Sequence, residues 1–216
     1  MTRELFAPDP HTSGTTRLGA QALVLRGFAL AHVAALWPAL LEVVAQAPFR
    51  HMLTPGGRRM SVPLTNCGPL GWTSDARGYR YSARDPASGL PWPALPAPFL
   101  RLAREAAAAA GFAGFAPDAC LLNRYTPGTR LTLHQDRNER DFSQPIVSVS
   151  LGIPAVFLWG GLLRSERALR VPLRHGDVAV WGGADRLRFH GVAPVPQDEH
   201  PLTGGVRINF TFRQAH

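Results

Sequence analysis

The sequence predicts an α+β fold in which helices come first and short strands follow. Two stretches with helical periodicity lie before Gly111, and several β-prone runs separated by turns lie after it. The 216 residues fit one domain with a sizeable core. Hydrophobic residues make up 45% and charged residues 18% of the chain, which argues against wholesale disorder. The second half is therefore predicted to be a β-rich sandwich or barrel.

The N-terminal part is predicted to hold a tail, an edge strand and a helix. Residues 1–18 are interpreted as a flexible tail, and the short apolar run 23–25 as an edge strand. An amphipathic helix over residues 30–47 follows. Pro38 is expected to kink this helix or to mark the start of its main part.

A Gly- and Arg-rich section, residues 50–81, shows little helical period. Five prolines in residues 85–98 indicate an extended connector. The second helix is predicted over residues 98–110, with proline at its start and Gly111 at its end, where each is favoured. Short strands or loops are expected within the Arg-rich section at 51–54, 59–62 and 79–81.

The strands of the second half are predicted from β-prone runs bounded by turn residues. No internal repeat is evident among them. They are expected over residues 120–125, 130–135, 146–151, 155–159, 169–173, 177–181 and 206–213.

The chain carries a formal net charge of +8, and all 23 basic residues are arginine. A basic surface attracts polyanions and steers them from a distance, so nucleic acid is one candidate partner. A basic protein with a small-molecule substrate is the alternative. Charge alone leaves both open.

Composition predicts a cytoplasmic protein. The two cysteines, Cys67 and Cys120, do not resemble a disulfide framework or a zinc knuckle, and are expected to be reduced thiols. Residues 1–20 lack the apolar core of a signal peptide. The most apolar window, 30–47, is interrupted by polar residues, which excludes a membrane span there.

Alternation along three predicted strands places polar side chains on shared faces, because residues two apart point the same way. His134 and Asp136 form one such pair, and Asn123 and Tyr125 form another. Polar groups aimed into a core need partners, which a metal and a dianionic ligand would supply. The longest polar row lies in the last strand and comprises Arg207, Asn209, Thr211 and Arg213.

His134, Asp136 and His190 offer two imidazoles and one carboxylate, the set that holds ferrous iron with coordination sites left open. Taken singly, a strand-end His beside a carboxylate, or a His before Gly in a turn, is usually structural. Two inward arginines are rarer, because buried guanidinium groups are costly unless they meet carboxylates. The combination favours an iron oxygenase with a dicarboxylic co-substrate.

Several stretches closely resemble the AlkB family of DNA/RNA dealkylases, which are iron(II)- and 2-oxoglutarate-dependent dioxygenases on a double-stranded β-helix, or jelly roll. The resemblance extends over nearly the whole chain except the tail. Within residues 49–98 it covers 54–57, 66–68, 70–72 and 91–93. In the second half it covers 123–125, 134–136, 181–183, 189–191 and 207–213.

The resemblance implies roles for particular residues, with Fe(II), 2-oxoglutarate and O2 as the cofactor and co-substrates. Arg207 would pair with the distal carboxylate of 2-oxoglutarate, and Arg213 would face the carboxylate nearest the iron and support Asp136. The implied iron ligands are His134, Asp136 and His190. The implied 2-oxoglutarate-binding residues are Asn123, Tyr125, Arg207, Asn209 and Arg213.

By the same resemblance, residues 49–98 are a nucleotide-recognition lid and connector. Chemistry on a base needs that base outside the stack, and Trp72 would stack on it with His134 as the opposite wall. Without the resemblance, Trp72 would be interpreted as a buried aromatic and the arginines as solvated charge. The implied substrate-binding residues are Met52, Thr54, Met60, Ser61, Trp72, Tyr79, Arg130, Gln135, Asn138 and Arg164.

The implied protein is one catalytic domain over residues 19–216, a monomer with no obligate protein partner and no membrane attachment. Its implied function is direct-reversal repair of 1-methyladenine and 3-methylcytosine in single-stranded DNA, with RNA as a further substrate. Oxidative demethylation would release formaldehyde and succinate.

Three other interpretations stay open. The same iron site could oxidise a small molecule, protein or lipid. The chain could be a catalytically silent nucleic-acid-binding module. A zinc site would leave the two arginines without an obvious use.

One position departs from the family pattern. Two residues after the iron-ligand Asp, bacterial members carry an acidic residue that helps recognise the lesion, and here the residue is Asn138. Asparagine keeps an acceptor for an exocyclic amine but loses the charge that favours a cationic methylated base. Asn138 is therefore expected to alter the preference among lesions and not the class of reaction.

Overall fold

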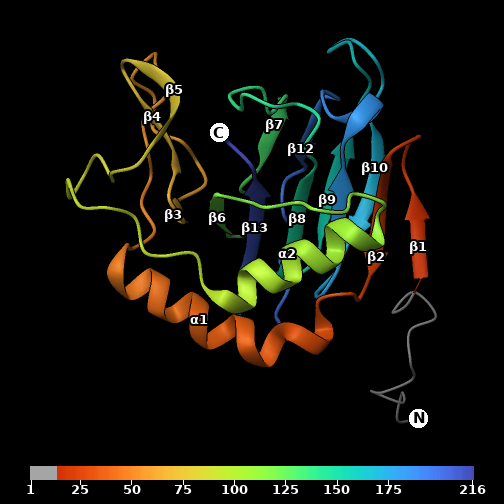
Figure 1. Ribbon diagram of the computed structural model, residues 1–216, viewed down its shortest axis with the longest axis horizontal. Coiled ribbons are helices and arrows are strands. Elements are labelled where there is room, and N and C mark those ends of the chain that lie inside the picture. Colours follow the sequence, from red (N-terminus) through yellow and green to blue (C-terminus); the bar gives the residue numbers. More distant parts are fainter. Residues whose placement is uncertain (1–13) are drawn as a thin grey trace.

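The computed structural model describes residues 14–216. Two β-sheets face each other, both long helices lie on one side of the larger sheet, and a two-stranded ribbon stands beside them (Figure 1). This confirms the predicted α+β class and the double-stranded β-helix core. None of the helices in the described residues is both long and apolar enough to cross a membrane.

The larger sheet has seven strands, and the smaller one has four. Neighbouring named strands pair antiparallel in both. In order across the larger sheet these are β1 (Gly14–Arg17), β2 (Ala22–Arg26), β11 (Val178–Trp181), β8 (Ile146–Gly152), β13 (Arg207–Arg213), β6 (Ala119–Tyr125) and β3 (Leu64–Cys67). Across the smaller sheet they are β10 (Leu169–Leu173), β9 (Ala155–Trp159), β12 (His190–Val192) and β7 (Leu131–His134). The separate ribbon consists of β4 (Gly71–Asp75) and β5 (Gly78–Ser82).

Two α-helices cover the outer face of the larger sheet: α1 (Val33–Gln46) and α2 (Ala97–Ala109). Short 3-10 turns occur at Leu30–His32 and Gly183–Asp185. Helix α1 continues through Pro38, whose missing N–H removes one helical hydrogen bond without ending the helix. In α2 a run of alanines favours the helix, and Phe99, Leu102 and Ala106 form the buried stripe.

Strand β13 divides the interior by alternation, as the sequence predicts. Ile208, Phe210 and Phe212 belong to the core beneath the helices, where Phe99 meets Phe210 edge-on at 4.9 Å between ring centroids. The polar row, Arg207, Asn209, Thr211 and Arg213, faces the other way, toward the smaller sheet.

Both apolar clusters and polar side chains lie between the sheets. One apolar cluster is built around Trp159, Phe157 and Trp181, and the other around Ile153 and Val195. The polar row of β13 lines the same pocket as members of both clusters. The core thus supports a polar pocket at its centre.

Several boundaries differ from the sequence prediction. Residues 1–13 of the predicted tail lie outside the described residues, but residues 14–17 form β1 and pair with β2. Of the segments expected as short strands or loops, 79–81 lies in β5, whereas 51–54 and 59–62 are loops joined by one bridge, Leu53 to Arg59. Strands β3, β4 and β12 were not predicted, because they are short and rich in residues such as Gly, Asn and Ser that disfavour strands on their own.

We predict that Phe99→Ala destabilises the fold by about 3–5 kcal/mol, because it removes a fully buried ring that packs on Phe210 and Phe212. Chemical denaturation measures the change. Leu41→Ala, on the exposed side of α1, is the matched control and is expected to change stability by less than about 0.5 kcal/mol. Equal effects of the two substitutions would show that α2 is not anchored as described.

Candidate active site

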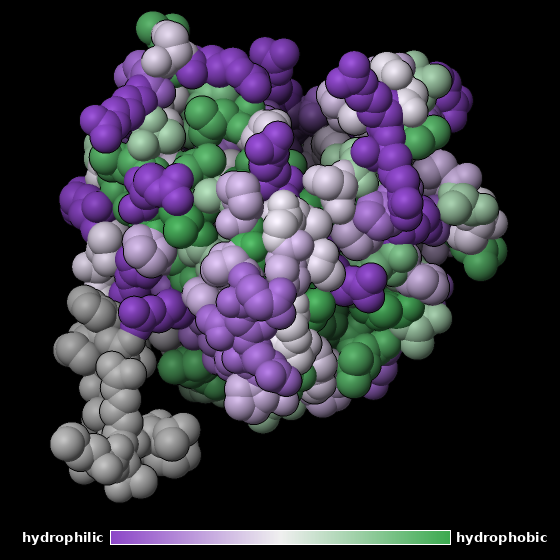
Figure 2. Space-filling view, turned by 180° about the vertical axis from the view of Figure 1, so that it is seen from behind, coloured by the Kyte–Doolittle hydropathy of each residue, from purple (hydrophilic) through white to green (hydrophobic). Residues whose placement is uncertain are grey.

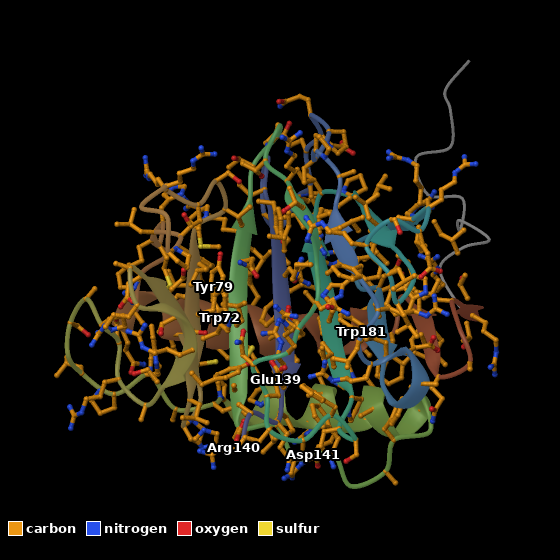
Figure 3. All side chains as sticks on the ribbon, turned by 90° about the horizontal axis from the view of Figure 1, so that it is seen from above. Trp72, Tyr79, Glu139, Arg140, Asp141 and Trp181 are labelled. Atoms are coloured by element: carbon orange, nitrogen blue, oxygen red, sulfur yellow. The ribbon has the colours of Figure 1, made fainter. Side chains whose placement is uncertain are left out.

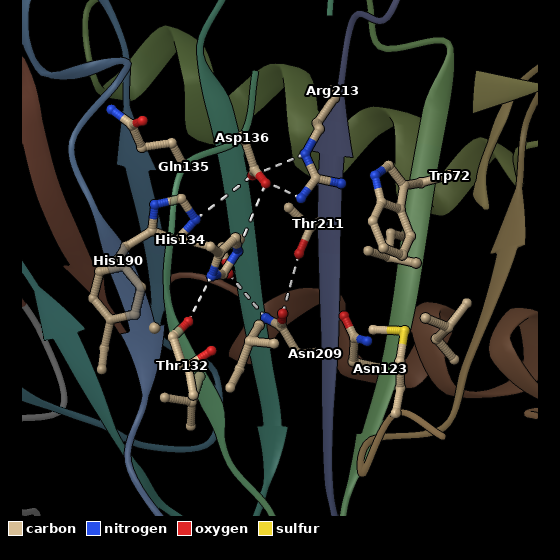
Figure 4. A pocket seen from close by; sticks show the side chains of 18 of the residues that line it. Trp72, Asn123, Thr132, His134, Gln135, Asp136, His190, Asn209, Thr211 and Arg213 are labelled. Carbon is tan, nitrogen blue, oxygen red and sulfur yellow. Dashed lines mark hydrogen bonds and ion pairs between the residues drawn. The ribbon is translucent and has the colours of Figure 1, made fainter. Parts of the chain in front are cut away.

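A pocket of about 320 Å³ opens between the two sheets. Strands β6, β8 and β13 of the larger sheet form its floor, and β7 and β12 of the smaller sheet form a wall (Figure 4). Trp72 and Tyr79 of the β4–β5 ribbon also line it. The size is within the range of small-ligand sites.

Three side chains in this pocket form a cluster that could hold a metal ion. His134 ends β7, Asp136 follows it, and His190 begins β12, which pairs with β7 directly at His134. Their ligand atoms all lie within 4.8 Å of one another. The His134 and His190 Nε2 atoms are 3.7 and 3.6 Å from the Asp136 carboxylate. Strand pairing thus joins residues far apart in the sequence.

The hydrogen bonds of both histidines suit metal binding. Nδ1 of His134 lies 2.9 Å from the Thr132 carbonyl, and Nδ1 of His190 lies 3.0 Å from the Arg188 carbonyl. A carbonyl only accepts, so each Nδ1 carries the proton and each Nε2 keeps its lone pair. Burial, with His190 nearby, also lowers the pKa of His134 to about 4. His134 therefore stays neutral near pH 7.

The carboxylate of Asp136 is fixed from the opposite side by Arg213. Nε and Nη2 of Arg213 donate to Asp136 Oδ2 at 3.0 and 2.7 Å. Burial opposes ionisation, but the Arg213 guanidinium holds the pKa of Asp136 well below its usual value. Asp136 is therefore a carboxylate whose orientation is set before any metal binds.

Arg207 lies at the floor of the pocket and is 1% exposed. Its Nη2 donates to Ser150 Oγ at 2.9 Å, and its guanidinium lies 5.0 Å from the Tyr125 ring centroid. Its Nε and Nη1 have no hydrogen-bond partner, and it forms no ion pair in the described part of the chain. Burial lowers its pKa. A buried cation with two free donors is a ready site for a carboxylate.

At the mouth, Trp72 and Tyr79 stack on each other, with ring centroids 5.4 Å apart and planes 16° apart. Trp72 Nε1 donates to Asn138 Oδ1 at 3.3 Å. His134 keeps 33% of its side chain exposed, whereas His190 is buried. The metal cluster is thus approached from the side of His134.

The structure brings most of the predicted substrate-binding residues to this pocket. Those that line it are Thr54, Met60, Trp72, Tyr79, Gln135 and Asn138. The predicted co-substrate residues Asn123, Tyr125 and Asn209 line it as well.

Four predicted substrate residues do not line the pocket. Met52 is buried, and its sulfur accepts from the Ser74 amide, so it is a packing residue. Ser61 and Arg130 are exposed and joined by a hydrogen bond from the Ser61 hydroxyl to the Arg130 carbonyl. Arg164 is exposed, with its guanidinium over the Phe189 ring. The last three could contact only a ligand that extends beyond the pocket.

Other lining residues were missed by the sequence analysis. Ser148, on β8, accepts a hydrogen bond from Asn209 Nδ2 at 2.9 Å. Its alternation with Ser150 in an otherwise apolar strand was an available signal. Glu139 and Arg186, which do not line the pocket, were also missed; they form a buried ion pair, and Arg186 donates to the Asp136 carbonyl. These two residues are 47 positions apart in the sequence, and no local pattern indicates that they pair.

The chain is similar in sequence and in fold to known dioxygenases. A family model described as the 2OG-Fe(II) oxygenase superfamily matches residues 21–213. An alpha-ketoglutarate-dependent dioxygenase AlkB from Salmonella typhimurium is 56% identical over 194 residues, covering 90% of each chain. The protein of the same name from Escherichia coli is 54% identical, covering 92% of each. The solved structure of OsALKBH1 superposes with a TM-score of 0.81 at 28% identity, covering 93% of this chain and all of that one.

The fold, the His–Asp–His cluster and the buried arginines define an iron(II)- and 2-oxoglutarate-dependent dioxygenase. Within that class the chain belongs to the AlkB family.

We predict that Asp136→Asn weakens binding of Mn(II), used as a redox-stable substitute for iron, by about 100-fold or more. The change removes the only charged ligand of the cluster, and loss even of groups that merely orient ligands typically costs 10–100-fold. Isothermal titration calorimetry under anaerobic conditions measures the Mn(II) affinity. Asp141→Asn, a nearby exposed carboxylate, is the control. Unchanged Mn(II) affinity in Asp136→Asn would place the metal elsewhere.

Proposed function

We propose that this dioxygenase repairs N-alkylated bases by direct reversal, removing the methyl group of 1-methyladenine and 3-methylcytosine in single-stranded DNA, and in RNA as a further substrate. One observation carries the proposal. A single pocket joins a metal cluster, an unpaired buried arginine and a pair of stacked aromatic rings. These suit a metal, a carboxylate co-substrate and a flat base, respectively.

His134, Asp136 and His190 would hold the iron. Both Nε2 lone pairs and the Asp136 carboxylate converge on one point, and two imidazoles with one carboxylate leave further coordination sites open. The network around them keeps Asp136 ionised and the histidines oriented, so that binding needs little rearrangement.

The free donors of Arg207 fit the distal carboxylate of 2-oxoglutarate, with Tyr125 covering one side of the guanidinium and Asn123 and Asn209 beside the chain of the ligand. Arg213 would face the carboxylate nearest the iron. When bound, iron with 2-oxoglutarate and O2 supplies an oxidant that hydroxylates a C–H bond, while 2-oxoglutarate is decarboxylated to succinate. A hydroxylated N-methyl group then leaves the base as formaldehyde.

The base would enter between Trp72 and His134. Tyr79 covers one face of Trp72, which leaves the other face for a base taken out of its stack. Gln135, whose amide donates to the Leu187 carbonyl, and Thr54 and Met60 complete the wall. Enclosure by flat side chains fits a nucleobase better than an extended peptide or a lipid.

The surface suits a polyanion. The formal charge is +8, and strongly hydrophilic residues gather on the upper parts of the face seen from behind, on the β4–β5 side and on the side of the β9–β10 loop (Figure 2). Exposed arginines of these segments are Arg77, between β4 and β5, and Arg164 and Arg167, between β9 and β10, and they suit a polyanion. Relatives named nucleic acid dioxygenase ALKBH1 support a nucleic-acid substrate. We further propose a cytoplasmic monomer with one catalytic domain, in which residues 49–98 form the nucleotide-recognition lid and connector.

To test this proposal, a single-stranded oligonucleotide that carries one 3-methylcytosine is incubated with the protein, iron(II), 2-oxoglutarate, ascorbate and oxygen. Mass spectrometry is expected to show loss of the methyl group, and His134→Ala is expected to abolish it. Consumption of 2-oxoglutarate without demethylation would move the substrate to another class. Absence of both activities in metal-loaded protein would favour a silent binding module.

We predict that Asn138→Asp raises activity on cationic lesions relative to neutral ones by about threefold to tenfold. The new carboxylate would stand at the pocket mouth beside Trp72, where solvent screens it and limits the gain to about 1 kcal/mol. The measurement compares kcat/KM on 3-methylcytosine with that on an uncharged exocyclic adduct. An unchanged ratio would remove Asn138 from lesion recognition.

A further inference from the structure

A buried ionic network connects the metal cluster to the β4–β5 ribbon through Glu139. The Glu139 and Arg186 side chains are each 2% exposed and form an ion pair at 3.0 Å. Tyr81 of β5 donates its hydroxyl to the other oxygen of Glu139 at 2.5 Å. In the view from above, Glu139 lies between the Trp72–Tyr79 pair and Trp181 (Figure 3).

The network continues to the carboxylate of the metal cluster by two routes. Arg186 Nη1 donates to the Asp136 backbone carbonyl at 2.8 Å, and its Nε donates to the Gln144 carbonyl at 3.0 Å. Arg213, which holds the Asp136 carboxylate, also lies 3.5 Å from Glu139. Glu139 therefore contacts three separate parts of the chain, all of them at or next to the pocket.

Charge balance explains why such a network tolerates burial. Asp136 and Glu139 supply two negative charges, and Arg186 and Arg213 supply two positive ones. Each buried ion has a partner within 3.0 Å. Burial also raises the pKa of Tyr81, so its phenol keeps the proton that it donates. An ion pair that served only the fold would not need the Tyr81 hydroxyl, which comes from the β4–β5 ribbon. It would also not need the backbone carbonyl of Asp136, which belongs to the His–Asp–His cluster.

We propose that Glu139, oriented by Arg186, is a positioning residue that links Tyr81 of the ribbon to Asp136, so that the base-stacking wall and the metal carboxylate are held in one geometry. This rests on the proposed function, because the wall is the one that would hold the base. Asn138, between Asp136 and Glu139, receives the hydrogen bond of Trp72 from the same ribbon. The segment 136–139 thus has two contacts to the ribbon and several to the metal side.

The consequence is a specific defect when the link is cut. If the wall is no longer held in register with the cluster, 2-oxoglutarate is still consumed, but fewer turnovers end in demethylation. A residue that only stabilised the fold would lower stability without changing the ratio of formaldehyde to succinate.

The first variant is Tyr81→Phe, which removes one hydroxyl and keeps the ring. We expect the coupling, which is the amount of formaldehyde released per succinate formed, to fall at least threefold. We also expect the Mn(II)- and 2-oxoglutarate-loaded variant to bind a 3-methylcytosine oligonucleotide at least threefold more weakly by fluorescence anisotropy. Its Mn(II) affinity should stay within twofold of the parent protein. Unchanged coupling together with unchanged oligonucleotide affinity would overturn the proposal.

A second variant, Glu139→Gln, and the double variant test whether both residues act through one bond. Because Tyr81 acts through Glu139, the double variant should release as much formaldehyde per succinate as Glu139→Gln alone. Additive losses would overturn the link. If Glu139→Gln does not fold, Arg186→Lys replaces it. Lysine cannot reach Glu139 and both carbonyls at once, and it is expected to lower coupling in the same way.

Arg26→Gln is the matched control. It breaks another largely buried ion pair, Arg26 with Asp177 at 2.7 Å, at the end of β11 away from Trp181. This variant should lower stability and leave coupling unchanged. A loss of coupling in Arg26→Gln would mean that weakening any buried ion pair has this effect, and it would overturn the proposal. Failure of the parent protein to demethylate would instead contradict the proposed function, and the anisotropy measurement would still test the link.

Discussion

Two guanidinium groups buried on the inner face of β13 determine how the pocket is built. Each costs several kcal/mol to remove from water unless it meets an anion. Arg213 meets Asp136 with two hydrogen bonds, whereas Arg207 keeps two donors free in the described part of the chain. One arginine therefore orients a carboxylate that could hold a metal ion, and the other holds a charge that a bound anion would balance.

The rest of the fold maintains this arrangement. Helices α1 and α2 bury the apolar face of β13, so its polar face must point between the sheets. Two apolar clusters, one with residues of β2, β9, β10 and β11 and one with residues of β6, β9 and β12, help to hold the sheets together. The pairing of β12 with β7 brings His190 to His134, which residue spacing alone does not determine. The pocket is thus a polar gap in an otherwise dry core, open toward the β4–β5 ribbon.

Sequence reasoning predicted what depends on local periodicity. The two-residue alternation of β13 correctly placed its polar row, which begins with Arg207 and ends with Arg213, on the pocket face, and proline and glycine marked the ends of α2. The short strands β3, β4 and β12 escaped prediction because tertiary pairing, and not propensity, forms them. The Glu139–Arg186 pair and the packing role of Met52 depend on contacts between distant segments, which no local pattern encodes.

The central claim is that Arg207 is kept for a carboxylate and not for the fold. Calorimetry of 2-oxoglutarate binding to Mn(II)-loaded Arg207→Met, with denaturation of the ligand-free protein, tests it most directly, and exposed Arg124→Met on β6 is the control. We predict that the affinity for 2-oxoglutarate falls by about 100-fold, since losing one partner of a buried charge pair costs about 2–5 kcal/mol. We also predict that the ligand-free variant is at least as stable as the parent. Parent-like affinity, or a marked loss of stability, would contradict it.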